Sequence, residues 1–241
     1  MKDDLIRELN DRFAESTVEE VLQYFLNEYK GRIAFASSLG AEDQVLTHMI
    51  REIAPDAKIF TLDTGRMFQE TYDLIDRTNA RYKMKMEIYF PDYKQVENMV
   101  NDKGMNLFYE SVENRKLCCH IRKIEPLHRA LEGSDIWITG LRKEQSVTRN
   151  NNNLLELDEN NHGRLKLNPL INWSEDEVWD FINKHKVPYN TLHDQGFQAL
   201  AVCPVPALSS LVKMYEPAGG GGKCRSTRSV GYIKNSLKFE V

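Results

Sequence analysis

Short apolar runs separated by helical repeats are the feature that most constrains how this chain of 241 residues can fold. Each run has the length of a buried strand, and most end in a polar or glycine-containing turn. The runs are residues 32–36, 58–62, 84–90 and 136–139. Strands that alternate with helices form right-handed crossovers and a mostly parallel sheet. The sequence therefore predicts an α/β fold, a doubly wound, Rossmann-like sheet with helices on both faces.

Helix-start signals predict further elements outside these runs. A first helix is expected over Asp4–Phe13, and capping boxes at Thr17–Glu20 and Ser174–Glu177 predict the starts of a second helix and of the last one. The polar segments Asn150–Asn153 and Asp158–Gly163 lie between the fourth strand and the last helix. Because these segments are rich in turn-forming residues, they predict an exposed loop within one domain.

Charge and hydropathy exclude several classes of partner. The chain carries 32 Lys and Arg against 36 Asp and Glu, and the net charge of −4 argues against binding to nucleic acid or to an anionic membrane. No apolar run reaches transmembrane length and the N-terminus is acidic and amphipathic, so a cytoplasmic protein is expected. The length suffices for one large core, which we place in residues 1–200. The oligomeric state stays open, with a homo-oligomer among the alternatives.

The turns after three of the strands predict a ligand site. Ligands of open parallel sheets bind outside the carboxyl ends of the strands, so the turns at Ser37, Asp63 and Gly140 are expected to converge. The segment Ser37–Gln44 joins a strand to a helix, and its backbone N–H groups are suited to hold an anion. It lacks the Gly-Lys-Ser/Thr ending of a Walker A loop. Taken alone, the segment is explained equally well as an ordinary capped turn.

Five motifs in chain order carry a resemblance to a known family. They are Ser37–Gln44, Leu62–Arg66 with Glu70–Tyr72, Cys118–Cys119, Gly140–Ser146 with Thr148–Arg149, and Asn168–Leu170 ahead of Trp173. In order and spacing they resemble the phosphoadenylyl-sulfate and adenylyl-sulfate reductases, which are relatives of the PP-loop nucleotide-binding proteins. The resemblance runs from about the second helix to Phe197, and five ordered motifs are far more specific than any one of them.

The resemblance implies an oxidoreductase of assimilatory sulfate reduction that converts adenylyl sulfate to sulfite and AMP, with thioredoxin as electron donor. It implies that a modified PP-loop receives the phosphosulfate end, that the second turn lies near the adenosine, and that two arginines clamp the phosphate and sulfate oxygens. The residues implied to bind substrate are Ser37, Ser38, Gly40, Asp63, Thr64, Gly65, Arg66, Arg142, Ser146 and Arg149. For the two arginines, a solvated surface is the alternative interpretation.

The adjacent cysteines Cys118 and Cys119 are unsuited to a mutual disulfide, because vicinal geometry is strained. Two neighbouring thiolates, together with further thiolates from distant parts of the chain, can form the ligand set of an iron–sulfur cluster. In the resembling family such a pair marks the branch that uses adenylyl sulfate and a [4Fe–4S] cluster, and a later Cys-x-x-Cys completes the ligands. Here Cys203 is followed by Pro204-Val205-Pro206, so the implied metal ligands are three, Cys118, Cys119 and Cys203. Two buried neutral cysteines are the alternative.

The resemblance ends near residue 200. The family's mechanism uses a cysteine thiolate in a C-terminal Glu-Cys-Gly-Leu-His motif, and residues 201–241 contain no such motif. No catalytic residue is therefore assigned. Cys224 lies beside a Gly-rich run unrelated to that motif and is a poor substitute, because nucleophilic attack requires an accurately placed sulfur. The segment 201–241 is expected to be mobile.

A shift of the reading frame explains this departure. Codons displaced by one base from near Ala201 permit three family motifs in their proper order. They permit Gly-Cys-x-Pro-Cys-Thr-Arg over Ala201–Ala207, Arg-Ala-Gly-Arg-Trp-Trp-Trp-Glu over Glu216–Lys223, and His-Lys-Glu-Cys-Gly-Leu-His over Thr227–Ile233. The hypothesis is that residues 201–241 are an out-of-frame reading of the family's C-terminus.

Three other functions remain as alternatives. The chain is expected to be a non-redox adenine-nucleotide-binding protein if its C-terminus is genuine. A phosphoadenylyl-sulfate reductase differs only in substrate, and the pair Cys118–Cys119 favours the unphosphorylated nucleotide. The related PP-loop sulfate adenylyltransferase subunit has no need of a cluster, so the same pair argues against it.

Overall fold

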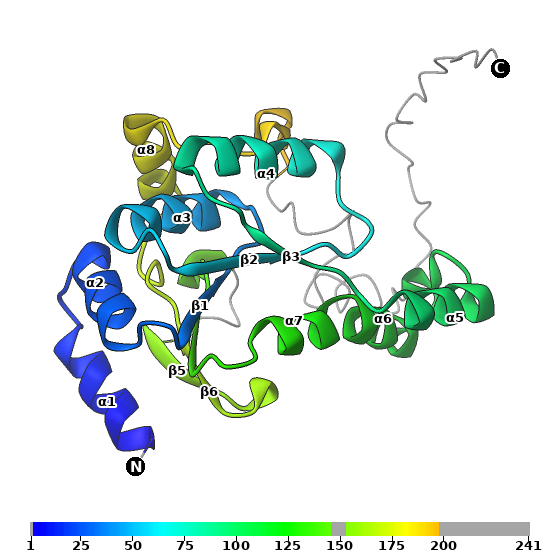
Figure 1. Ribbon diagram of the computed structural model, residues 1–241, viewed down its shortest axis with the longest axis horizontal. Coiled ribbons are helices and arrows are strands. Elements are labelled where there is room, and N and C mark those ends of the chain that lie inside the picture. The colour runs from blue at the N-terminus through cyan, green and yellow to red at the C-terminus, as the bar shows by residue number, and fades with distance from the viewer. Residues whose placement is uncertain (1, 146–152, 198–241) are drawn as a thin grey trace, which may run out of the picture. The chain divides into compact units, whose positions relative to one another are not determined.

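The computed structural model of the chain describes residues 2–145 and 153–197 (Figure 1). A six-stranded sheet forms the centre of this part, in the order β3-β2-β1-β4-β6-β5. Neighbouring strands are parallel except for β5, which runs antiparallel to β6. The strands are β1 (Ile33–Ala36), β2 (Lys58–Leu62), β3 (Glu87–Tyr89), β4 (Ile136–Ile138), β5 (Leu155–Asp158) and β6 (Arg164–Leu167). The predicted α/β fold with a mostly parallel sheet is confirmed.

Helices connect and cover the strands. They are α1 (Lys2–Arg12), α2 (Val18–Glu28), α3 (Ala41–Ile53), α4 (Gln69–Tyr82), α5 (Tyr93–Lys103), α6 (Val112–Cys119), α7 (Glu125–Ala130) and α8 (Glu175–His185). Short 3₁₀ turns are η1 (Leu107–Tyr109), η3 (Lys143–Gln145), η5 (Glu159–Asn161) and η6 (Thr191–Gln195), and a π turn, η2 (His120–Ile124), joins α6 to α7. Both predicted capping boxes are formed, at the starts of α2 and α8. Within the two described ranges, no helix is long and apolar enough to cross a bilayer.

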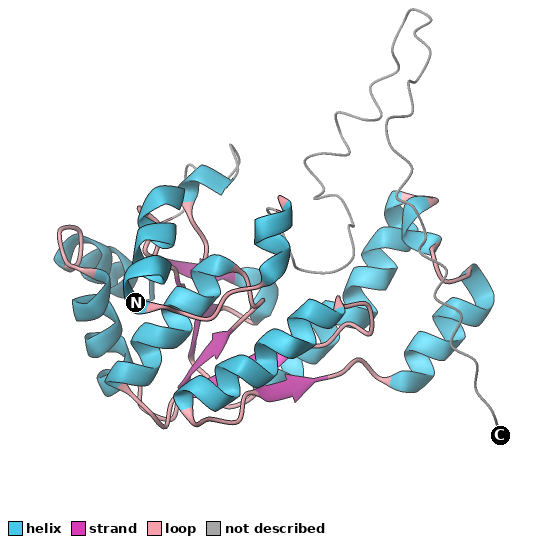
Figure 2. Cartoon of the chain, turned by 90° about the horizontal axis from the view of Figure 1, so that it is seen from above, coloured by secondary structure: helices cyan, strands magenta, loops and turns pink. Residues whose placement is uncertain are grey.

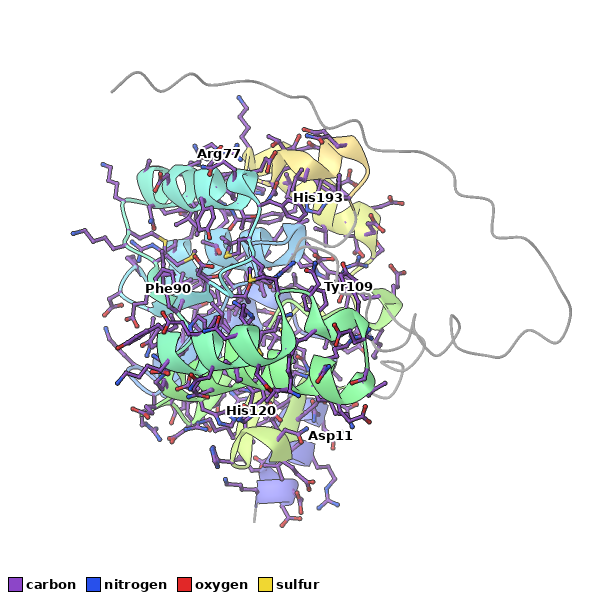
Figure 3. The ribbon with its side chains drawn as sticks, turned by 90° about the vertical axis from the view of Figure 1, so that its right-hand side faces the viewer. Asp11, Arg77, Phe90, Tyr109, His120 and His193 are labelled. Carbon is purple, nitrogen blue, oxygen red and sulfur yellow. The ribbon has the colours of Figure 1, made fainter. Side chains whose placement is uncertain are left out.

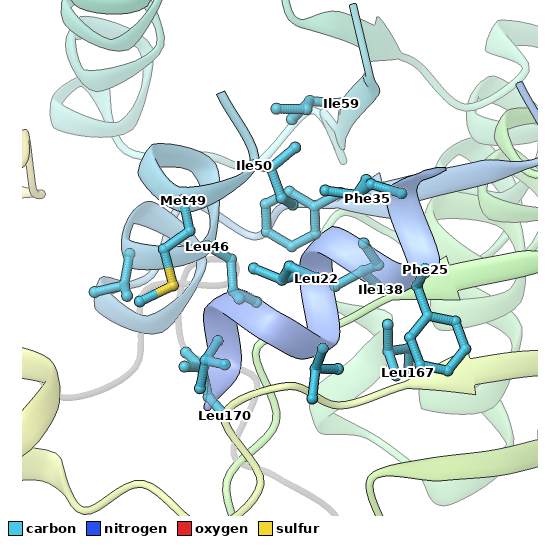
Figure 4. Close-up of a cluster of buried hydrophobic side chains, with 14 of the residues drawn as sticks. Leu22, Phe25, Phe35, Leu46, Met49, Ile50, Ile59, Ile138, Leu167 and Leu170 are labelled. Carbon is cyan, nitrogen blue, oxygen red and sulfur yellow. The ribbon is translucent and has the colours of Figure 1, made fainter. Parts of the chain in front are cut away.

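Each face of the sheet has its own core. Side chains alternate along a strand, so Ile33 and Phe35 of β1 belong to the core that includes residues of α2, α3 and α8, whereas Ala34 packs with Phe60 and Leu131 beside α7. Figure 4 shows Phe35 among side chains of α2 and α3. Figure 2 shows helices on both sides of the strands. Burial on both faces explains why β1 and the middle of β2 read as continuous apolar runs rather than as alternating ones.

The strand order reverses at β1. The chain passes from β1 through β2 to β3 on one side, and then places β4 on the other side of β1. The register pairs Phe35 of β1 with Ile138 of β4, so both strands end at nearly the same level. Such a reversal is where open α/β sheets bind their ligands, at the carboxyl ends of the strands.

The predicted loop before the last helix is wrong in part. Residues 158–163 do form a turn, but this turn joins β5 to β6 as an antiparallel hairpin. The alternation of leucine with charged residues over 155–158 and 164–167 is a strand signal, since one face of each strand is buried. Residues 150–152 lie outside the described part. Helices α6 and α7 were not predicted, and β3 begins at Glu87, three residues later than predicted.

The helix α1 protects the outer strand β5. The side-chain amide of Asn10 donates from Nδ2 to the Leu155 carbonyl at 2.9 Å, and the Leu155 N–H donates to Asn10 Oδ1 at 2.9 Å. The amide thus pairs with the strand much as another strand would. Exposed strand edges invite unwanted pairing with other chains, and this contact closes the edge locally.

Substitution of Asn10 by alanine is expected to lower the free energy of unfolding by about 1–3 kcal/mol, because Leu155 loses both partners in a partly buried position. Urea titration followed by circular dichroism measures this loss. Asn27→Ala, at an exposed position of α2, is the matched control and is expected to change stability by less than about 0.5 kcal/mol. Equal effects of the two substitutions would contradict the assigned role of Asn10.

Candidate functional site

The turn after β1 is held in an unusual backbone conformation. Ser37 N–H donates to the Phe60 carbonyl of β2 at 2.8 Å, and Ser37 Oγ accepts the Leu39 N–H at 3.2 Å. Leu39 has a φ of 64°, which is rare for a residue other than glycine, and its fully buried side chain holds the backbone there. Gly40, implied by the family resemblance to bind substrate, is the N-cap of α3 with an ordinary φ of −71° and room for a Cβ atom.

One buried carboxylate ties this turn to the turn after β4. Oδ2 of Asp43, in the first turn of α3, accepts the Ser38 N–H at 2.5 Å and the Ser38 hydroxyl at 2.6 Å. The Gly140 N–H also donates to Asp43, and a Cβ atom at residue 140 would overlap Oδ1. Burial raises the pKa of Asp43 to about 6, although the hydrogen bonds from Ser38 oppose this rise.

The adjacent carboxylate, Glu42, holds Arg142. Arg142 Nε donates to Glu42 Oε1 at 2.8 Å, and Arg142 Nη1 lies 3.0 Å from Glu144 Oε2. The side chain of Arg142 is only 5% exposed, whereas that of Glu144 is 60% exposed. Gln145 Nε2 donates to Glu42 as well, at 2.9 Å. The predicted guanidinium therefore lies beside the turn after β1, where two carboxylates of the chain balance its charge.

The turn after β2 is fixed by Asp63. Its buried carboxylate accepts the Gly65 N–H at 2.7 Å and the Tyr72 hydroxyl at 2.8 Å. Gly65 has a φ of 71°, a conformation that favours glycine. Burial and the hydrogen bond to Asp63 raise the pKa of Tyr72, so its hydroxyl stays a donor. Both Asp63 oxygens thus hold the turn in place.

A buried arginine connects this turn to the helix that bears the cysteines. Arg122, in the π turn η2, donates from Nη1 to the Thr64 carbonyl at 2.6 Å. Arg122 Nε and Thr64 Oγ1 are buried without a hydrogen-bond partner, and no ion pair with Arg122 occurs within the described ranges. A buried charge without a counter-ion is unfavourable. This corner of the site therefore has an unused N–H donor and an unused hydroxyl group, which suit a polar ligand group.

Arg66 is held by the segment around η1. Its Nη1 donates to the Met105 carbonyl at 3.0 Å, its Nη2 donates to Asn106 Oδ1 at 3.3 Å, and its guanidinium lies 4.8 Å from the centre of the Phe108 ring. Arg66 Nε is buried and lacks a partner. The predicted ligand-binding arginine thus also fixes the position of η1 against the turn after β2.

Cys118 and Cys119 are the last residues of α6, and both thiols are free. Cys118 is buried beside Met99 and Phe108, whereas Cys119 is half-buried. The π turn η2 follows directly, and such turns are frequent at functional sites. Tyr109 and His120, which precede and follow α6 in the sequence, are labelled in Figure 3.

The thiols do not make up the ligand set of a [4Fe–4S] cluster. Such a cluster is usually held by four thiolates. Cys118 and Cys119 supply two, and no group of three metal-ligating side chains occurs among residues 2–145 and 153–197. The third predicted ligand, Cys203, lies outside the described residues, as do the predicted substrate-binding residues Ser146 and Arg149. Even with Cys203, the predicted ligands are one short of four.

Three residues of this site were not singled out from the sequence. Glu42 and Asp43 lie within the first motif, but acidic residues in the first turn of a helix are ordinarily explained by the helix dipole. Their signal is the combination of two adjacent acids with a preceding Ser-Ser-Leu-Gly turn. Arg122 gives no signal in the sequence, because its partner Thr64 is 58 residues away.

Comparisons with known proteins agree with this geometry. The phosphoadenosine phosphosulfate reductase domain matches residues 32–208. An adenosine 5'-phosphosulfate reductase of Allochromatium vinosum is 49% identical over 172 residues, which cover 71% of this chain and 67% of that protein. Another, of Bacillus mycoides, is 38% identical over 219 residues, which cover 89% of this chain and 86% of that protein.

A solved structure shares the fold. The phosphoadenylyl-sulfate (PAPS) reductase of Candida auris, in complex with phosphate, is similar with a TM-score of 0.71 and 29% identity, over 82% of this chain and 93% of that one. The domain match includes all six strands and the three turns described above. The chain therefore belongs to the phosphoadenosine phosphosulfate reductase domain family, and its named relatives are oxidoreductases.

Proposed function

We propose that this chain binds adenylyl sulfate and that its in-frame form reduces this substrate to sulfite and AMP, with thioredoxin as electron donor. One observation supports the proposal most. In a chain of the reductase family, the turns after β1, β2 and β4 occur at the carboxyl ends of adjacent strands, where the strand order reverses. This is the position at which an open α/β sheet binds a nucleotide.

The phosphosulfate end is assigned to the side of the site formed by β1 and β4. The first N–H groups of α3 have no partner within the helix and carry its positive dipole end, which suits an anion. Arg142 lies beside them, and its exposed partner Glu144 is the carboxylate that an incoming phosphate or sulfate would replace. From the family motif, we also propose that Ser146 and Arg149, which lie outside the described residues, bind the phosphosulfate.

The adenosine end is assigned to the turn after β2. Asp63 and Gly65 fix the backbone of this turn, while the unpaired Thr64 hydroxyl is free to bind a polar group. Arg66 and Arg122 border the same turn, each with an unpaired Nε–H group. Substrate is thus bound mainly by groups that the fold has already oriented, which limits the entropy lost on binding.

The chemistry follows from family resemblance. A cysteine thiolate attacks the sulfur of adenylyl sulfate, and the bond between that sulfur and the bridging phosphate oxygen breaks. AMP leaves with the electron pair, and the enzyme holds an S-sulfocysteine. Two electrons from the thioredoxin dithiol then cleave the S–S bond and release sulfite, and thioredoxin becomes a disulfide. Cations at the site stabilise the phosphate that departs.

The relatives and the adjacent cysteines both favour adenylyl sulfate as the substrate. The relatives that are 38–49% identical are named adenosine 5'-phosphosulfate reductases, whereas the fungal structure of 29% identity is a phosphoadenylyl-sulfate reductase. In the family resemblance, the pair Cys118–Cys119 accompanies the unphosphorylated substrate. Adenylyl sulfate is therefore the proposed substrate.

The nucleophilic cysteine and the missing cluster ligands are assigned to the reading frame that is displaced by one base from near Ala201. Restoring one base near Ala201 permits both Cys-x-x-Cys and Glu-Cys-Gly-Leu-His, as the codon argument requires. The chain as written keeps the groups proposed to bind the nucleotide, all from residues before Ala201. Reduction and nucleotide binding are therefore separable in this protein.

The chain as written is expected to bind AMP and to release no sulfite from adenylyl sulfate, because it retains the binding groups and lacks the nucleophile. Isothermal titration with AMP and a sulfite assay with reduced thioredoxin measure the two properties. The matched control is the same chain with one base restored near the codon for Ala201, which is expected to do both. Absence of AMP binding by both proteins would refute the proposed function.

Anaerobic reconstitution with iron and sulfide is expected to load the frame-restored protein with about four irons per chain, as in a four-thiolate cluster. The chain as written is expected to hold far less, because its predicted ligands number at most three. Iron and acid-labile sulfide assays measure the content. Cys118→Ser in the restored protein is expected to abolish loading, and full loading of the chain as written would show that its own residues suffice.

A further inference from the structure

The carboxylate of Asp43 occupies a position that the proposed chemistry does not account for. It is buried in the first turn of α3, directly beside the proposed phosphosulfate region. A carboxylate there disfavours an anionic ligand, and burial without charge compensation is unfavourable in itself. We therefore expect the hydrogen bonds of Asp43 to stabilise the site enough to offset both the repulsion of the ligand and the unfavourable burial of the charge.

The two oxygens of Asp43 face different loops. Oδ2 accepts both donors of Ser38, at 2.5 and 2.6 Å, from the turn after β1. Oδ1 lies against Gly140 in the turn after β4, whose N–H donates to the carboxylate. A Cβ atom at residue 140 would overlap Oδ1, so any larger residue there would displace the Asp43 carboxylate. One side chain thus joins the two loops on opposite sides of the strand reversal.

The joined loops carry the proposed ligand groups. The first contains Ser37–Gly40 and leads into the N-terminus of α3. The second loop contains Gly140 and, two residues later, Arg142. The guanidinium of Arg142 forms an ion pair with Glu42, the residue before Asp43. The position of Arg142 relative to α3 therefore depends on two adjacent acids, one acting on the backbone of the loop and one on the guanidinium.

We propose that Asp43 is a positioning residue that joins the loops after β1 and β4, so that the first turn of α3 and Arg142 face the phosphate of the nucleotide together. Asp43 does not contact the ligand. This inference deepens the proposed function and rests on it. It also accounts for Ser38, since the N–H and the hydroxyl group of Ser38 both donate to Asp43.

The variant Asp43→Asn tests the proposal most directly. Asparagine has nearly the same shape but carries one oxygen and one NH₂ group, so it can accept from Ser38 or from Gly140 and not from both. Loss of one charge-assisted contact is expected to weaken AMP binding about tenfold or more, measured by isothermal titration at pH 8. Glu52→Gln, an exposed acid in the last turn of α3, removes the same charge from the same helix and is expected to leave AMP affinity unchanged.

A double-mutant cycle with Ser38→Ala separates positioning from general damage. Ser38→Ala removes one of the contacts to Asp43 and keeps the Ser38 N–H, so a smaller loss of AMP affinity is expected. In the Asp43→Asn background the same change is expected to cost less than in the wild type, because the two residues act through one contact. Additive losses would contradict the proposed link between Ser38 and Asp43.

The pH dependence gives a further readout. Burial is the main cause of the raised pKa of Asp43. Of the groups that face its carboxylate, Glu42 raises the pKa further, and the Ser38 and Gly140 donors lower it. Since the pKa of Asp43 is about 6, the carboxylate becomes protonated as the pH falls through that value and can then no longer accept from both loops. The ratio of AMP affinity between wild type and Asp43→Asn is expected to approach one below pH 6. Protonation of the AMP phosphate changes the affinity of both proteins by the same factor, so it does not affect this ratio.

Hydrogen exchange distinguishes failure of this inference from failure of the proposed function. In nucleotide-free protein, the amides of Ser38 and Gly140 are expected to exchange faster in Asp43→Asn than in the wild type. Unchanged exchange would overturn the inference, and so would faster exchange with unchanged AMP affinity. If exchange quickens but the wild type itself binds no AMP, the proposed nucleotide function fails, and the role of Asp43 in ligand positioning fails with it.

Discussion

The contact between Asp43 and two loops is the constraint on which the geometry of the site depends. At the strand reversal, the connections that leave β1 and β4 run to opposite sides of the sheet. The turns after these two strands therefore belong to separate connections, although the strands themselves are adjacent. Nothing in the sheet hydrogen bonding fixes the spacing of two such turns. A carboxylate with one oxygen for each turn does fix it, and the close approach explains the glycine at residue 140.

The electrostatics of the site follow from this arrangement. Two acids in the first turn of α3 lower the positive potential that a helix N-terminus would otherwise present to an anion. Arg142 restores positive charge and is oriented by Glu42. On the other side of the site, Arg122 is buried and has no acidic partner within the described ranges. Arg122, beside the turn after β2, is therefore less neutralised by acidic residues than Arg142, although the turn after β1 leads directly into a helix N-terminus.

The sequence predicted the parts of the structure that follow from periodicity. Strands buried on both faces, capped helix starts and the turns at the carboxyl ends of β1, β2 and β4 were all found where local pattern indicated them. The hairpin of β5 and β6 was not predicted, because the run of asparagines before it is typical of a loop, although the alternating leucines that follow are a strand signal. Contacts such as Arg122 with Thr64 depend on tertiary packing, which no local pattern encodes.

The cysteine pair and the proposed nucleotide site are linked through the backbone of one turn. Arg122 follows Cys119 by three residues, and it binds the Thr64 carbonyl between the two fixing residues Asp63 and Gly65. Because the turn is rigid and Arg122 is buried, a change in the conformation of η2 must displace either the guanidinium or the turn. The buried contact of Arg122 with Thr64 thus connects the backbone that follows the cysteines to the turn assigned to the adenosine.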